Sequence, residues 1–140
     1  MMPRTALLKT SALLLALIAG PSFAHAAQDV SDGLLADLGH IARASGVGME
    51  LQLAAVPVSP AVLALATAAR ASELALGGGD DYQLVFTAPP AAHRSIAALG
   101  ARLPVLLTCI GRVVTGAEVQ VMDTGGRRVP VAVSGYQHFA

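Results

Sequence analysis

Two polar runs at the boundaries of regular elements organise this 140-residue chain. Asp29-Val-Ser-Asp-Gly-Leu34 stands before a helical pattern in which Leu34, Leu38 and Ile41 fall on one face. Gly77-Gly-Gly-Asp-Asp-Tyr-Gln-Leu84 is a glycine-rich turn that leads into an apolar strand pattern. Each run therefore places carboxylates in a turn between two elements, where binding residues tend to collect.

The remaining pattern alternates between helices and strands. Ser31 or Asp32 is the expected N-cap of the first helix, which ends at Gly46 to Gly48. The other expected elements are a strand over 49–53, a helix over 60–69, a strand over 82–87, a helix over 90–99, strands over 103–114 and 118–122, a turn over 123–126 and a last strand over 128–133. This order predicts an α+β fold, a mixed β-sheet with packed helices.

Residues 1–26 resemble a secretory leader. Arg4 and Lys9 give a basic start, residues 12–20 are apolar, and Ala24-His25-Ala26 offers small residues before a cut. The alternative is an apolar helix of the globular domain. Because the apolar run is too short to cross a bilayer, no stable membrane span is expected. The predicted organisation is a leader or apolar helix over 1–26 and a domain over 27–140.

Composition excludes several function classes. The formal net charge is zero and the basic residues are scattered, so the chain is not expected to bind nucleic acid. Cys109 is the single cysteine, which rules out an intramolecular disulfide. No spacing of His, Cys and Glu matches a zinc site. Hydrophobic residues make up 54% of the chain, which is enough for a packed core.

The first polar run is a candidate cation and phosphate site. If Asp29 ends a strand and Asp32 lies in the turn, both carboxylates can converge on Mg²⁺, which prefers oxygen ligands. Ser31 and the free amides of the first helical turn can meet a phosphate. The alternative is ordinary N-capping.

The second run and the C-terminal tail give further candidates. Asp80 and Asp81 place like charges side by side, which implies a nearby cation or ligand donor; the alternative is a solvated acidic turn. Tyr136 either stacks on a flat ligand or fastens the tail to the core.

Together with Ile110-Gly-Arg-Val113 and Gly135-Tyr-Gln-His-Phe139, these runs resemble the C-terminal half of thiamine-monophosphate kinase. That family belongs to the superfamily of aminoimidazole ribonucleotide synthetase, and the resemblance covers about residues 24–140. Asp29 to Leu38 is close to the family signature, and the middle run is similar to the family's Gly-Gly-Glu-Asp-Tyr-Glu-Leu. The implied fold is that of the superfamily's C-terminal domain.

The resemblance implies ATP- and Mg²⁺-dependent phosphorylation of thiamine monophosphate to thiamine diphosphate. It implies that Asp29 and Asp32 hold Mg²⁺, that Ser31 contacts ATP, and that Asp80 and Tyr136 contact the thiamine substrate. Two positions depart from the family: Asp80 replaces a Glu, and Gln83 replaces a second Glu.

The resemblance also implies an N-terminal domain that this sequence lacks. We therefore expect little activity from the lone half, and a partner chain with the missing domain or a homodimer as its assembly. The family implies a cytoplasmic location, whereas the leader pattern favours secretion. The alternatives to an enzyme are an exported, non-catalytic thiamine-phosphate-binding protein and a decayed fragment.

Overall fold

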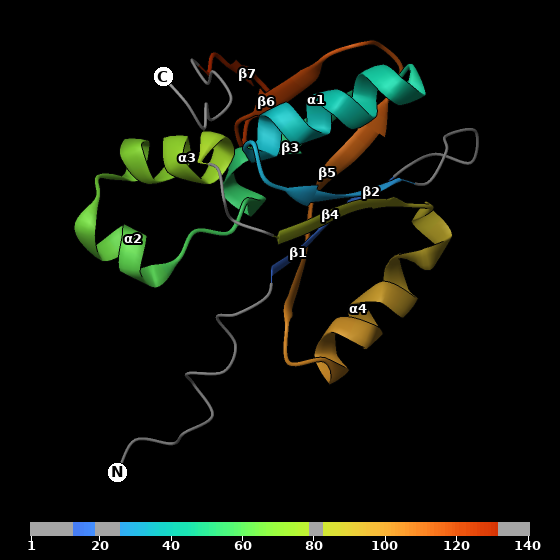
Figure 1. Ribbon diagram of the computed structural model, residues 1–140, viewed down its shortest axis with the longest axis horizontal. Helices are drawn as coiled ribbons and strands as arrows, with labels where there is room; N and C mark the ends of the chain where they lie inside the picture. The colour runs from blue at the N-terminus through green and yellow to red at the C-terminus, as the bar shows by residue number, and fades with distance from the viewer. Residues whose placement is uncertain (1–12, 19–25, 79–82, 132–140) are drawn as a thin grey trace.

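The computed structural model describes residues 13–18, 26–78 and 83–131. Within these ranges the strands form one sheet in the order β2-β4-β1-β5-β3-β6-β7 (Figure 1). The strands are β1 (Leu13–Ile18), β2 (Ala27–Val30), β3 (Gly48–Gln52), β4 (Gln83–Ala88), β5 (Leu106–Val114), β6 (Val119–Met122) and β7 (Arg128–Val129). The helices are α1 (Leu34–Ser45), α2 (Pro60–Leu65), α3 (Ala68–Gly77) and α4 (His93–Arg102), with 3₁₀ turns η2 (Leu53–Ala55) and η3 (Pro90–Ala92).

The sheet is mixed, as the sequence predicts. β1 is parallel to both β4 and β5, and β3 is parallel to β6. The pairs β2–β4, β3–β5 and β6–β7 are antiparallel. In Figure 1, α1 lies above β2 and β4, and α4 lies below them, which confirms the predicted mixed sheet with packed helices.

The main core lies between α1 and the sheet. The predicted apolar face of α1 is buried, with Leu34, Leu38 and Ile41 each at most 7% exposed. These side chains belong to a cluster that includes Val30, Met49, Leu51, Val85, Ile110 and Val121 from the strands. Burial of this stripe fixes α1 over the sheet, and with it the turn that precedes α1.

The leader-like segment contributes a strand to the interior of the sheet. Over Leu13–Ile18 the backbone pairs with β4 on one side and with β5 on the other, so the apolar helix proposed as an alternative is not found there. A parallel strand with neighbours on both sides is often a continuous apolar run, and such a run also looks like the centre of a leader.

Two helices differ from their predicted extents. The helix expected over 60–69 stops at Leu65, and a second helix begins at Ala68 after Thr67, whose hydroxyl accepts the Arg70 amide at 3.3 Å. The helix expected to stop at Gly100 continues to Arg102. A Cβ at Gly100 would lie 2.9 Å from the Leu107 Cβ, so this glycine allows close helix–strand packing and does not end the helix.

No helix among the described residues is long and apolar enough to cross a membrane.

Candidate functional site

The first polar run forms the connection from β2 to α1. Asp29 lies in β2, opposite Leu84 of β4, and Ser31 and Asp32 form a bend after the strand. The N-cap of α1 is Gly33, with φ 113° and ψ 146°, and no side chain caps this end. The prediction of Ser31 or Asp32 as the N-cap is therefore wrong, because the chain extends for one more residue in a conformation that only glycine adopts easily.

A carboxylate from inside the helix organises this bend. Asp37 is fully buried. One of its oxygens, Oδ2, accepts the backbone amides of Ser31 at 2.8 Å and Asp32 at 3.1 Å. The other, Oδ1, accepts the Gln28 side-chain amide at 2.7 Å. His40, half exposed one turn further along, places its Nδ1 3.7 Å from the same Oδ1.

These bonds occupy two amides of the bend, which precede the first turn of α1 named in the phosphate prediction. A phosphate cannot accept the amides of Ser31 and Asp32 while Asp37 occupies them. Ser31 still places a partly exposed hydroxyl in the bend. At Ser31 and Asp32, a ligand therefore meets the side chains and not the backbone amides.

The two predicted metal ligands differ in their surroundings. Asp29 is exposed, and strand alternation puts it on the side of β2 opposite to Gln28 and Val30. Asp32 is half-buried, and its carboxylate lies within 4.8 Å of ligand atoms of Asp37 and His40. Among the described residues, Asp32 therefore groups with Asp37 and His40, and Asp29 stands outside that group.

The second polar run begins and ends beside the first. A Cβ placed on Gly33 would lie 2.9 Å from the carbonyl oxygen of Gly77, the last residue of α3. After the glycine-rich turn, Gln83 pairs with Val30 in the β2–β4 ladder. Asp80 and Tyr136 lie outside the described residues, so their predicted substrate contacts stay predictions.

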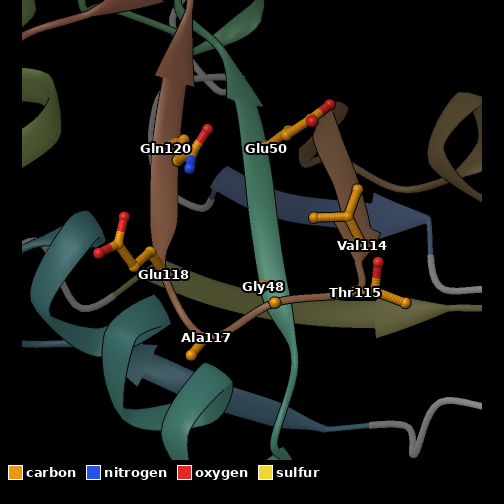
Figure 2. A pocket seen from close by; sticks show the side chains of 8 residues that line it. Gly48, Glu50, Val114, Thr115, Ala117, Glu118 and Gln120 are labelled. Carbon is orange, nitrogen blue, oxygen red and sulfur yellow. The ribbon is translucent and has the colours of Figure 1, made fainter.

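A separate hollow lies at the opposite end of α1. It has a volume of about 270 Å³, and its lining comes from β3, from the end of β5 and the turn after it, and from β6: Gly48, Glu50, Val114, Thr115, Gly116, Ala117, Glu118 and Gln120 (Figure 2). Its acids form ion pairs, Glu50 with Arg112 at 2.6 Å and Glu118 with Arg128 at 3.5 Å. The 12 residues of α1 span about 18 Å, which separates this hollow from the polar bend.

Asp37 and Gln28 are functional candidates that sequence reasoning does not single out. A signal is present for Asp37, which lies on the same helical face as Leu34, Leu38 and Ile41. A carboxylate on an apolar face must find hydrogen-bond donors, and the nearest ones are the amides of the preceding bend. No comparable signal marks Gln28.

Comparison with known proteins identifies the family. Residues 3–124 match the family model described as AIR synthase related protein, C-terminal domain. Among curated proteins, thiamine-monophosphate kinase of Escherichia coli strain K12 is 38% identical over 117 residues, which cover 84% of this chain and 36% of that kinase. The kinase of Haemophilus influenzae is 42% identical over 90 residues, covering 64% of this chain and 27% of that protein.

Solved structures agree. Thiamine-monophosphate kinase from Stenotrophomonas maltophilia superposes with a TM-score of 0.69 at 44% identity, over 77% of this chain and 33% of that one. AaThiL complexed with AMPPCP and TMP gives a TM-score of 0.62 at 36% identity, over 84% and 35%. The chain thus spans about a third of the length of the kinases that it matches. It belongs to the family of AIR synthase related proteins, C-terminal domain, in the form found in thiamine-monophosphate kinases.

Proposed function

We propose that this chain supplies the C-terminal half of a thiamine-monophosphate kinase site, which transfers the γ-phosphoryl group of ATP to thiamine monophosphate. The observation that carries the proposal is the meeting of the two polar runs. Gly33 lies against Gly77, and Val30 pairs with Gln83, so turns more than 40 residues apart in sequence adjoin. A related protein of the same fold binds AMPPCP and TMP.

The donor set fits Mg²⁺ in part. Asp29 and Asp32 offer carboxylate oxygens, one exposed and one half-buried, and Mg²⁺ is typically bound by one or two carboxylates together with phosphate oxygens. Asp37 is a poor ligand because three of its roughly four lone-pair positions already accept hydrogen bonds. When bound, Mg²⁺ would neutralise charge on the phosphates, which is the main requirement of phosphoryl transfer.

Contacts with ATP and with the thiamine substrate are assigned to three further side chains. The Ser31 hydroxyl is assigned to ATP, because it stands in the bend between the two carboxylates and is open to solvent in part. Asp80 and Tyr136 are assigned to the thiamine substrate by their positions in the matching motifs. Their work is to bind and orient, since this reaction needs no covalent nucleophile.

We infer that the chain alone has little activity and needs a partner that carries the rest of the site. The residues of this chain align with about a third of the length of the matching kinases. The groups of one site act as a unit, so a partial set loses most of the rate. We also infer that it works in the cytoplasm, where ATP is available; the pairing of β1 within the sheet supports this over export.

Calorimetric titration tests substrate binding. The purified chain is titrated with thiamine monophosphate in the presence of Mg²⁺ and AMPPCP. We expect saturable binding that weakens in Asp80→Ala and Tyr136→Ala and persists in Glu73→Ala, an exposed acid on α3. Absence of binding by a folded sample would contradict the proposal.

Co-expression with the N-terminal part of a homologous kinase tests whether a partner completes the site. A chain carrying the N-terminal part of a homologous kinase is produced together with this one, and phosphorylation of thiamine monophosphate is assayed. We expect Mg²⁺-dependent activity that Asp32→Asn abolishes and Glu73→Ala retains. An inactive wild-type pair would refute complementation.

A further inference from the structure

The most unusual polar group in the described structure is the carboxylate of Asp37. It is 0% exposed, in a core otherwise formed largely by aliphatic side chains. All three of its donors come from the segment that carries the predicted ligands: the side chain of Gln28 and the amides of Ser31 and Asp32. A buried charge is tolerated when such donors satisfy it, so the carboxylate and the bend stabilise one another.

The two amides are the part of the bend best suited to an anion. Consecutive backbone N–H groups before a helix form an anion-binding concavity in many phosphate sites. Here Asp37 Oδ2 accepts both of them. A phosphate approaching these amides would have to displace a negative charge and then stay beside it, which is unfavourable.

We propose that Asp37 is the positioning residue of this site. Its carboxylate closes the amides of Ser31 and Asp32 to phosphate and fixes the bend, so that a phosphate beside these two amides is held through a cation bound by Asp29 and Asp32. The inference rests on the proposed function for the presence of that cation. It adds a residue to the site and specifies how the bend recognises phosphate.

The test is an NMR titration of the full, ¹⁵N-labelled chain, following the amides of Ser31 and Asp32. In the wild type, inorganic phosphate alone should shift neither amide, whereas MgCl₂ followed by phosphate should shift both. A shift of either amide signal on addition of phosphate alone would overturn the proposal that Asp37 closes these amides to phosphate. This titration needs no variant, so it holds whether or not substitutions at position 37 fold.

Asp37→Asn tests the positioning role. Its amide oxygen can accept the two backbone N–H groups, and the Gln28 amide can rotate to accept from its NH₂ group, so the variant is expected to fold. We expect Mg²⁺ affinity to fall about 10- to 100-fold, as happens when partners of metal ligands are changed. Leu38→Ala, a buried neighbour on α1, should destabilise the fold but keep the wild-type Mg²⁺ affinity. Equal Mg²⁺ affinity in Asp37→Asn and the wild type, or an equal loss in Leu38→Ala, would overturn the role.

Failure of the proposed function gives a different pattern. A folded wild-type chain that binds no Mg²⁺ overturns the cation's part in both proposals. The hold of Asp37 on the bend is then judged by hydrogen exchange of the two amides. Exchange about tenfold faster in Asp37→Asn supports that hold, because a charged acceptor bonds more strongly than a neutral one, and equal exchange refutes it.

Discussion

At the scale of single residues, the bend before α1 depends on one buried acid. Asp37→Ala leaves three donors facing a small apolar side chain, with the amides of Ser31 and Asp32 among them. We expect the free energy of unfolding to fall by about 2–3 kcal/mol, because three partly buried donors lose a charged acceptor. Urea unfolding followed by circular dichroism measures it. Glu73→Ala removes an exposed acid paired with Arg70, and should cost less than about 1 kcal/mol.

Gly33 is the second residue on which the site depends. It needs its positive φ of 113° and also approaches Gly77, whereas a Cβ added to Gly46, at φ 64°, would meet no atom within 4 Å. Gly33→Ala should therefore cost about 3 kcal/mol, from backbone strain and displacement of Gly77. Gly46→Ala should cost about 1 kcal/mol, from the left-handed conformation alone. Urea unfolding of both variants measures the difference, and equal losses would mean that the contact between the polar runs contributes nothing.

Sequence reasoning finds the solvent-accessible residues Asp29, Ser31 and Asp32 more readily than the buried Asp37 that holds the bend. Asp29, Ser31 and Asp32 form a local pattern, and the structure places Asp29 near the end of β2 and the other two in the bend before α1, as that pattern requires. The contact between Gly33 and Gly77 joins residues 44 positions apart in the sequence, and no periodicity encodes it. The start of the helix is mispredicted because a polar N-cap is the usual choice, whereas here Gly33 is the N-cap and no side chain caps the helix.

At the scale of elements, the β6–β7 hairpin has a built-in response to acid. The amide of Arg127 donates to Asp123 and, with the Arg127 guanidinium and the amide of Gly125, lowers the pKa of Asp123 below its usual 3.8. A lowered pKa gives stability that is complete above pH 3.8 and is lost as the pH falls through the folded-state value.

The hairpin prediction is checked by following the Gly125 amide by NMR from about pH 6 to about pH 2, a range that brackets the titration of an ordinary Asp. We expect its shift to report release of the turn below pH 3.8 in the wild type. Asp123→Asn should remove this transition, and Glu73→Gln should leave it unchanged. A transition that survives in Asp123→Asn would assign it to another group.

Element prediction succeeds where capping and periodicity agree. Ser59 and Pro60 mark the start of α2, and the apolar stripe marks α1, as expected. The break at Ala66–Thr67 escapes prediction because alanine-rich sequence continues a helix on propensity alone, while Thr67 caps a new one. The end of α4 is mispredicted because a glycine such as Gly100 is typical of the end of a helix. Here the glycine is present because α4 packs closely on Leu107.

At the scale of the whole molecule, the sheet depends on the segment that resembles a leader. Without β1, the order β2-β4-β1-β5-β3-β6-β7 separates into β2-β4 and β5-β3-β6-β7. Ala26, the residue before the expected cut, donates its amide to Thr87 Oγ1 at 2.9 Å, and its carbonyl accepts the Thr87 amide at 2.8 Å. Cleavage there would thus remove one strand and break the anchor of another.

Deletion of residues 1–26 should therefore abolish cooperative unfolding. The measurement is a urea titration followed by circular dichroism on the chain 27–140. Deletion of residues 1–9 is the matched control, because it removes the basic start of the leader pattern and leaves Leu13–Ile18 in place. A cooperative transition in 27–140 equal to that of the control would show that β1 is dispensable.

The position of β1 also sets an order of events during synthesis. Among the described strands, β1 precedes both of its neighbours: β4 ends at Ala88 and β5 ends at Val114. Its pairing on both sides is therefore complete only after Val114 has been made. At translation rates of about 5–20 residues per second, roughly 5–20 s pass between its emergence and that of its second partner. During the first part of that interval, before β4 has been made, this apolar segment has neither of its neighbouring strands. The sheet therefore closes on both sides of β1 only after β5 has been made, and β1 must stay available for pairing until then.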